Sequence, residues 1–473
     1  MRTKNDYLSS LADGREVYYR GKKVDSIHDH PVLRIAALHA AKLYQIERSH
    51  YDEELGRETS SYFTKPRTAS DLVRRHRLIY STTMECNGVF NISQAIGSDA
   101  IFALTLTALE TDRNYGTNYS PLVRDYHRYV ASKDLTLAVA QTDVKGDRKK
   151  RPHEQSDPDM YLHVTREERD GIIVNGAKAH TTQAAVSDEI IAIPTRAMTE
   201  RDRDYAIAFA VPAATEGLKF IVRPIDELEG NRSSILSKAD YELETLTIFD
   251  NVFVPRDRIF QLREYGMAGK LAVTFATFHR FTAVSYRAAT SNLYLGASIS
   301  MAKHNGILDT PHVKDRLSEL VMYRELMRMS AIAAANAPLE IDGIVVPNPV
   351  YTNIGKLYSN KNFANVLDAL VDISGGIIST APSIEDWENA VEEKYIKKYL
   401  SGAEVTGSRE DAIRIAKELG ASSHAGYMLT LMLHAEGSIE ASKMALLKDA
   451  DLAEAEKLVD KILSGEKSKE KPQ

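Results

Sequence analysis

The middle of the chain reads Gly171-Ile172-Ile173-Val174-Asn175-Gly176-Ala177-Lys178-Ala179-His180-Thr181-Thr182. Its β-branched residues, interrupted by Gly and Asn, are typical of a strand that is bounded by turns. Similar short runs occur on both sides of it, at residues 161–164, 189–194, 205–212, 219–222 and 244–249. Several strands at this spacing predict a compact β-barrel or sandwich, and we expect a middle β-barrel domain over residues 136–265.

The two flanks of this β-rich region have helical patterns. Residues 1–135 read as a mostly helical domain, with Thr68 to Asp71 as an N-cap and a short hairpin over residues 17–24. Residues 266–464 carry long stretches rich in Ala, Leu and Met, which predict a C-terminal helical bundle. Residues 465–473 are charged and are expected to form a disordered tail. The order of helices, strands and helices indicates an α+β protein of three domains.

Composition excludes several classes of function. A chain of 473 residues with 43% hydrophobic and 27% charged residues is ordinary for a globular protein, and its net charge of −6 gives no basic field for nucleic acid. The N-terminus lacks an apolar signal segment and no run of about 18 apolar residues occurs, so we expect a cytoplasmic protein without a membrane span. The single cysteine, Cys86, excludes an intrachain disulfide and a cysteine-rich metal site within one chain.

Four motifs occur in a characteristic order: Thr142 to Arg148, Asp157-Pro158-Asp159, Gly176 to Thr182, and Phe249 to Pro255. Further anchors are Asp372-Ile373-Ser374-Gly375-Gly376 and His434-Ala435-Glu436-Gly437-Ser438. In this order and spacing the chain resembles the flavin-dependent superfamily of 4-hydroxybutyryl-CoA dehydratases and 4-hydroxyphenylacetate 3-hydroxylases. The resemblance implies an acyl-CoA dehydrogenase-like fold, a homotetramer, and FAD between the β domain and the C-terminal bundle.

Several residues are candidates for contact with FAD. Gln141 and Thr142 begin the segment that the resemblance places against the flavin, whose pyrimidine edge suits neutral polar groups. The hydroxyls of Thr181 and Thr182 would lie near the ring, or they are ordinary polar residues of a strand. Ser374-Gly375-Gly376 would allow the backbone to approach a phosphate or ribityl chain, or would end a helix with a glycine cap.

Two further candidates have equally simple alternatives. Ser383 is either a flavin contact or the cap of a helix that begins before Glu385. The basic run from Lys145 to Arg151, with Lys145 and Arg148 as the candidates, is either an anion site or a solvated loop.

The positions that bind iron in the dehydratases are changed. The resemblance places two cysteines four residues apart, a histidine, and a third cysteine seven residues later, and these positions fall here on Asn91, Ala95, His279 and Tyr286. Only the histidine is retained, and amide, methyl and phenol groups do not replace thiolates. We therefore expect no metal and no iron–sulfur cluster, and a buried structural role for Cys86.

The phenol-binding set of the hydroxylases is also changed. The resemblance places an Arg and a Tyr at the positions of Asn91 and Ala95, and a His near Val139. The substrate of this chain is therefore not given by either branch of the superfamily.

Four residues are candidates for catalysis. His279 can act as an acid, a base or a hydrogen-bond donor near pH 7. Glu244 matches a glutamate in the dehydratase active site, where its carboxylate could pair with His279, or it is a surface acid at the edge of a strand. Tyr286 and Arg287 follow His279 by two helical turns on nearly one face, so that the phenol can donate to a substrate oxygen.

Three functions are compatible with these residues. The first is a monooxygenase that uses reduced FAD from a separate flavin reductase, because the sequence has no obvious NAD(P)H fingerprint and this chemistry needs no metal. The second is a flavin-dependent isomerase or dehydratase acting on a CoA thioester; moving a double bond needs only an acid and a base, so isomerisation tolerates loss of the cluster better than dehydration does. The third is a flavin-binding or assembly protein without catalysis.

Overall fold

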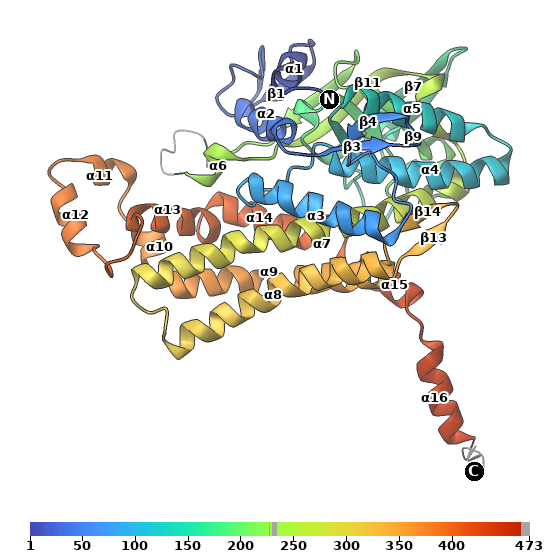
Figure 1. The fold of residues 1–473 in the computed structure, drawn as a ribbon. Helices are drawn as coiled ribbons and strands as arrows, with labels where there is room; N and C mark the ends of the chain where they lie inside the picture. Colours follow the sequence, from blue (N-terminus) through green and yellow to red (C-terminus); the bar gives the residue numbers. More distant parts are fainter. Residues whose placement is uncertain (227, 229–233, 465–473) are drawn as a thin grey trace.

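The computed structural model describes residues 1–226, 228 and 234–464. Its two antiparallel-rich sheets lie in the upper part of Figure 1, above the long helices. The larger sheet has six strands in the order β2 (Lys22–Lys23), β1 (Glu16–Tyr19), β10 (Leu218–Val222), β11 (Glu244–Pro255), β7 (Gly171–Thr182) and β6 (His163–Glu167). The smaller sheet has the order β12 (Ile259–Leu262), β9 (Ile207–Pro212), β8 (Glu189–Ala192) and β5 (Leu137–Ala140). The run that opens at Gly171 is thus a single 12-residue strand.

The expected β-barrel is not closed. Within the described residues, no ladder joins an edge of one sheet to the other, so the middle of the chain is a pair of open sheets. Apolar side chains from both sheets and from α1 (Lys4–Ser10) and α2 (Leu33–Lys42) form one core, including Val174, Phe209 and Phe220. Burial of these apolar side chains stabilises the packing of the two sheets, although the sheets do not close into a barrel.

The N-terminal region contributes to the larger sheet. The expected hairpin is confirmed as β1 and β2, with Tyr18 opposite Lys23. β1 also pairs in parallel with β10, about 200 residues later in the chain, and buries Val17 and Tyr19 in the core. The N-terminal region therefore supplies two strands to the six-stranded sheet.

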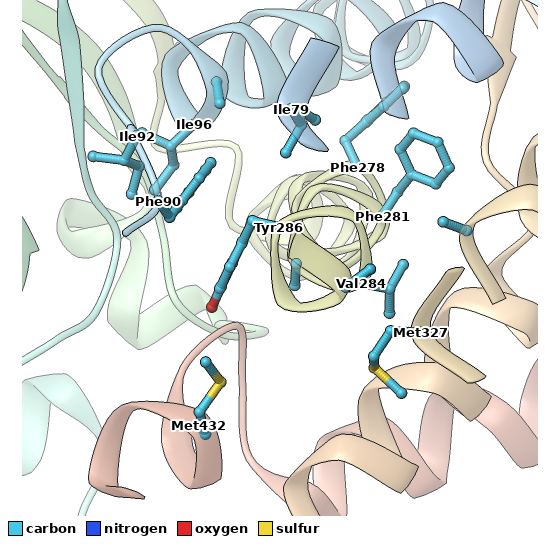
Figure 2. Close-up of a cluster of buried hydrophobic side chains, with 14 of the residues drawn as sticks. Ile79, Phe90, Ile92, Ile96, Phe278, Phe281, Val284, Tyr286, Met327 and Met432 are labelled. Atoms are coloured by element: carbon cyan, nitrogen blue, oxygen red, sulfur yellow. The ribbon is translucent and has the colours of Figure 1, made fainter. Parts of the chain in front are cut away.

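The long helix α7 (Tyr265–His304) carries three of the four predicted catalytic residues. It packs against α3 (Ala69–Glu85), α4 (Ala95–Tyr115), α8 (Pro311–Asn336), α9 (Pro349–Ser374) and α13 (Arg409–Gly420). Figure 2 looks along α7 and shows Tyr286 directed toward Met432, and Val284 toward Met327. Because residues 278–291 of α7 are all buried, their polar side chains must find partners inside the protein.

The remaining elements surround this frame. α3 begins at the predicted N-cap, where Thr68 and Asp71 form a capping box. The other helices are α5 (Tyr119–Lys133), α6 (Leu236–Ala239), α10 (Ile377–Thr380), α11 (Ile384–Glu388), α12 (Glu393–Tyr399), α14 (Ser423–His434), α15 (Ile439–Asp449) and α16 (Ala453–Leu463). Two small hairpins are β3 (Ser49–Asp52) with β4 (Arg57–Ser60), and β13 (Leu339–Ile341) with β14 (Ile344–Val346).

In Figure 1, α16 extends away from the body of the molecule. No helix in the described part of the chain is both long and apolar enough to cross a bilayer. The predicted tail at residues 465–473 lies outside the described residues.

Candidate active site

His279 is held in place by a buried carboxylate. Its Nδ1 lies 3.2 Å from Oδ2 of Asp99, a residue of α4 that is fully buried. Arg75 donates to the other Asp99 oxygen at 2.6 Å and Thr282 donates to the same oxygen at 3.1 Å. The imidazole also stacks on Phe275, with ring centroids 5.2 Å apart. The carboxylate fixes the orientation of the imidazole, as in other acid–base sites where a third group positions the base.

A second buried ion pair lies farther along α7. The Arg287 guanidinium is 2.5 Å from Glu436, and the Tyr286 hydroxyl donates to the same carboxylate at 2.7 Å. Burial by itself would raise the pKa of Glu436, but Arg287, His279 and Lys356 hold it below its ordinary value. The effect of His279 on this pKa shows that the two clusters share one electrostatic environment.

Two basic side chains donate hydrogen bonds to the backbone of the turn that carries Glu436. Lys356 donates to the Gly437 carbonyl, and Arg280 donates to the Glu436 carbonyl at 3.1 Å. Glu436 and Gly437 have φ values of +55° and +95°, and a Cβ at Gly437 would lie 3.0 Å from the Arg280 guanidinium. Burial lowers the pKa of Lys356 to about 7, with Arg287 and Arg280 adding to the effect. Lys356 is therefore a titratable group near neutral pH.

Glu244 does not pair with His279, contrary to expectation. One of its oxygens, Oε1, accepts hydrogen bonds from Thr182 and Tyr427, each at 2.9 Å. The reason is register, because Glu244 lies directly opposite Thr182 across the β7–β11 ladder. The other oxygen, Oε2, is buried without a partner in the described part of the structure. Burial raises the pKa of Glu244, which favours a neutral carboxylic acid.

The predicted flavin-facing residues of the β region lie near Glu244. Thr181 is fully buried, and its hydroxyl has no partner among the described residues. Gln141 and Thr142 follow β5 and are half-buried, and their backbone carbonyls accept hydrogen bonds from Lys178 and from the Ala179 amide, respectively. The ends of β5, β7 and β11 therefore meet at one place.

The basic loop borders the same region. Lys145 and Arg148 are exposed. Burial lowers the pKa of His180, and the charges of Lys145 and His434 lower it further. His180 of β7 therefore lies within electrostatic range of Lys145 and of His434 at the end of α14.

The glycine motif is remote from His279 within this chain. Ser374 ends α9, Gly375 has φ +69°, and the Ser374 carbonyl accepts from Asn305 at 3.5 Å. Asn305 follows His279 by 26 residues along α7, which corresponds to roughly 40 Å of helix. Ser374, Gly375 and Gly376 therefore do not join the His279 site within one chain, and their contact with flavin stays a prediction.

Ser383 is a helix cap. It is the N-cap of α11, where its side chain and that of Asp386 form a capping box. A flavin contact by Ser383 also stays a prediction.

The positions matched to the iron ligands have different surroundings. Ala95 offers its carbonyl to Arg75 at 3.0 Å, Tyr286 stacks on Phe90 at 4.4 Å, and Asn91 donates to the His39 carbonyl at 2.9 Å. Asn91, Ala95 and Tyr286 are all buried. These positions offer an amide, a methyl group and a phenol beside a single imidazole. They do not fit an iron–sulfur cluster, because such a cluster requires thiolate ligands.

Iron analysis tests this conclusion. Protein produced in cells with active iron–sulfur assembly and purified without oxygen is expected to contain no stoichiometric iron, because three of the four ligand positions offer no sulfur. Iron and sulfide at the level of one cluster per chain would contradict the assignment.

His39, Cys86 and Asp240 also lie together, with ligand atoms within 4.8 Å of one another. His39 is already bonded through Nδ1 to Asp240 at 2.8 Å and through Nε2 to the Phe90 carbonyl at 3.0 Å. Burial would lower the pKa of His39, but Asp240 and Cys86 raise it to about 10. Because both nitrogens carry protons, this group is an ion pair and not a metal site. Cys86 is fully buried, as expected.

Several site residues escaped prediction from sequence. Arg75, Asp99, Arg280, Lys356 and Glu436 come from five different elements or turns. Glu436 lies within the His434 to Ser438 anchor, so that motif was the one available signal. The others are single charged residues inside helices, where nothing in the local pattern distinguishes them from a solvated face.

Comparisons with known proteins identify the family. Models of the N-terminal and C-terminal regions of 4-hydroxyphenylacetate 3-hydroxylase match residues 3–261 and 268–464, respectively. The chain belongs to the 4-hydroxyphenylacetate 3-hydroxylase family. This assignment confirms the superfamily expected from the motifs.

Members of both branches are among its relatives. The chain is 30% identical to 4-hydroxybutyryl-CoA dehydratase/vinylacetyl-CoA-Δ-isomerase of Clostridium aminobutyricum, over 98% of this chain and 99% of that protein. It is 27% identical to the oxygenase component of 4-hydroxyphenylacetate 3-monooxygenase of Thermus thermophilus, over 87% and 86%. An oxygen-tolerant archaeal 4-hydroxybutyryl-CoA dehydratase from N. maritimus has a similar structure, with a TM-score of 0.92 and 27% identity over 100% of this chain and 97% of that one.

Proposed function

We propose that this protein is the oxygenase component of a two-component monooxygenase, which uses reduced FAD and O2 to hydroxylate a small organic substrate. The observation that supports this most strongly is the replacement of the thiolate positions by Asn91, Ala95 and Tyr286, while His279 is kept and oriented by Asp99. Acid–base groups remain where a Lewis-acid cluster does not fit.

The residues at the joint of the sheets and α14 fit FAD. Thr181 and Glu244 each have a buried side-chain oxygen without a partner in the described residues, and buried polar atoms of this kind need a hydrogen-bonding group. Gln141, Thr142 and Thr182 are the further polar groups for the ring, and Lys145 and Arg148 are the cations available for phosphates. When bound, reduced FAD would supply the two electrons with which one oxygen atom of O2 enters the substrate and the other is released as water.

The protein residues have separate tasks in this proposal. The imidazole of His279 accepts or donates a proton at the substrate, and Asp99 and Phe275 hold the ring in place. Tyr286, Arg287 and Glu436 form a rigid, buried wall beside it. The buried Glu244 Oε2, which has no partner among the described residues, offers a hydrogen-bonding group at the ends of these strands.

The relatives support a flavin reductase as partner. Oxygenase components in the family imply a separate flavin reductase as partner. We also propose a homotetramer, a cytoplasmic location, and Ser374 to Gly376 as a site completed in the assembled enzyme.

The second candidate is a flavin-dependent isomerase of CoA thioesters. The 30% identity to the dehydratase/isomerase over nearly the whole chain favours it. His279 and Glu244 would then move a proton between two carbons, and Arg287 would keep the cation that the dehydratases have as lysine.

A paired assay separates the two candidates. FAD-loaded protein is incubated in air with a flavin reductase, NADH and a panel of phenols. The masses of the products are measured by mass spectrometry. The same protein is incubated without oxygen with vinylacetyl-CoA. Gain of one oxygen atom in the first reaction supports the monooxygenase; conversion of vinylacetyl-CoA with no oxygenated product in the first would establish the isomerase instead.

A further inference from the structure

Lys178 of β7 is a buried cation whose hydrogen bonds all lead to residues just beyond β5 and β8. Its ammonium group donates to the Gln141 carbonyl at 2.8 Å, to Asp143 Oδ1 at 2.6 Å and to the Ile193 carbonyl at 3.1 Å. Only 5% of the Lys178 side chain and 6% of the Asp143 side chain are exposed. Because an ammonium group has three protons, all of its donors are used inside the protein. Lys178 therefore joins three separate segments of the chain at one point.

A bulge in β7 places Lys178 on the same face as Thr181. Lys178 lies opposite Thr247 and Thr181 lies opposite Thr245, so three steps along β7 match two steps along β11. Residues three apart on a regular strand face opposite sides, but the extra residue brings both side chains to the buried side of the sheet. The backbone change is at His180, whose φ is +56°. Lys178 thus shares a face with the Thr181 hydroxyl, which has no partner among the described residues.

The segment that this ammonium group contacts is held mainly through its backbone. The Thr195 hydroxyl donates to the Gln141 carbonyl at 2.5 Å and accepts from the Asp143 amide at 3.1 Å. A backbone amide of β7 donates to the Thr142 carbonyl at 2.9 Å. The Gln141 side-chain amide reaches one backbone carbonyl at 3.5 Å, and the Thr142 hydroxyl has no hydrogen-bond partner in the described part of the chain. The backbone is therefore fixed while these two side chains stay available to a ligand.

Asp143 balances the charge of Lys178. Its second oxygen, Oδ2, is buried and has no hydrogen-bond partner within the described residues, and Arg196 Nε lies 3.9 Å away from it. Because the buried ammonium and carboxylate groups offset each other, this pair adds no net charge beside Gln141 and Thr142. The side chains that remain available are neutral donors and acceptors, which suit the pyrimidine edge of an isoalloxazine ring.

We propose that Lys178 is a positioning residue of the flavin site, which holds Gln141 and Thr142 beside Thr181 for contact with the isoalloxazine ring. The proposal rests on the proposed function, which places FAD at the ends of β5, β7 and β11. Lys178 acts through the Gln141 backbone and through Asp143, because no proton of its ammonium group is left for the flavin.

The first test measures flavin binding by Lys178→Met, which keeps most of the side-chain volume and removes the ammonium group. FAD binding is expected to weaken by about 10- to 100-fold, since the groups that contact the ring lose their fixed positions. The absorption bands and the midpoint potential of bound FAD should also shift from those of the wild type. Fluorescence titration with FAD and a redox titration measure these effects. A wild-type dissociation constant, spectrum and potential in this variant would overturn the proposal.

A double variant separates positioning from stability. Lys178→Met alone leaves the Asp143 carboxylate buried without its partner, which by itself destabilises the fold. Lys178→Met combined with Asp143→Asn removes both charges and should recover much of the stability in denaturant unfolding. FAD binding should stay weak and the flavin spectrum should stay shifted. Recovery of wild-type FAD binding in the double variant would contradict the proposal, because the lysine would then serve only to neutralise Asp143.

Hydrogen exchange tests the same link in flavin-free protein. Peptides covering residues 141–148 should exchange faster in Lys178→Met than in the wild type, because one connection between β7 and the turn after β5 is lost. The matched control is Lys219→Met on β10, where the lysine pairs with Asp250 at 2.6 Å and 28% of its side chain is exposed. This control should change neither the exchange of residues 141–148 nor FAD binding. Unchanged exchange in Lys178→Met would show that Lys178 does not hold the segment.

The failure of this proposal differs from that of the proposed function. If the wild type binds FAD but places no oxygen in any product, the monooxygenase assignment is wrong, and the FAD titrations still decide the role of Lys178. If oxygen is incorporated and Lys178→Met binds FAD as the wild type does, only the positioning role is wrong. A wild type that binds no FAD would overturn both.

Discussion

Replacing His279 with alanine is expected to lower turnover by a factor of about 10²–10⁴ while FAD remains bound. The side chain is oriented by Asp99 and Phe275, and its contacts with described residues are on the helical core and not on the predicted flavin-facing strands. Loss of the imidazole therefore removes an acid–base group and leaves the ends of β5, β7 and β11 intact. Turnover under saturating FAD, together with flavin binding by fluorescence, measures both parts of the prediction.

The matched control for this variant is His304→Ala. His304 is also buried on α7, but it lies 25 residues farther along the helix. Its replacement should leave turnover nearly unchanged even if stability falls. Activity of His279→Ala equal to that of the wild type would show that His279 is structural.

Replacing Arg287 with alanine is expected to destabilise the fold by about 3–5 kcal/mol and to abolish activity. Arg287 is 1% exposed and donates to Glu436, Ser359 and Asn360. Removal of the guanidinium leaves the Glu436 carboxylate buried without its main partner, and this uncompensated charge is the principal cost. Denaturant unfolding of the two proteins measures the difference.

Two further variants separate charge from packing at this site. Arg287→Met combined with Glu436→Gln removes both charges and should recover much of the lost stability, although not the activity. Arg113→Ala breaks an exposed ion pair with Asp342 and should change stability little. A loss in Arg287→Ala no larger than that in Arg113→Ala would mean that the buried pair contributes little.

Local patterns predicted the elements better than their closure. The β-branched run at Gly171 to Thr182 became one strand, and the hairpin at residues 17–24 formed as expected, because side-chain alternation and turn residues act over short distances. The pairing of β1 with β10 joins segments about 200 residues apart. Whether the edges of the two sheets pair with each other also depends on contacts between distant segments. No local signal encodes such pairings, so the expected closed barrel was wrong.

Local patterns also predicted only part of the candidate site. His279, Tyr286 and Arg287 share one helix, and helical spacing alone brings them together. Their partners, Asp99 and Glu436, come from α4 and from the turn after α14, and only tertiary packing places them there. Glu244 is buried, but register with β7 gave it Thr182 as a partner in place of His279, and its catalytic role stays a prediction.

The fate of molecular oxygen tests the central claim most directly. FAD-loaded protein, a flavin reductase and NADH are incubated under ¹⁸O2 with the substrate that turns over best in the phenol panel, and the product is analysed by mass spectrometry. Incorporation of one ¹⁸O atom per molecule of product is the result expected of a monooxygenase. A product that carries no ¹⁸O, formed equally well without oxygen, would contradict the assignment.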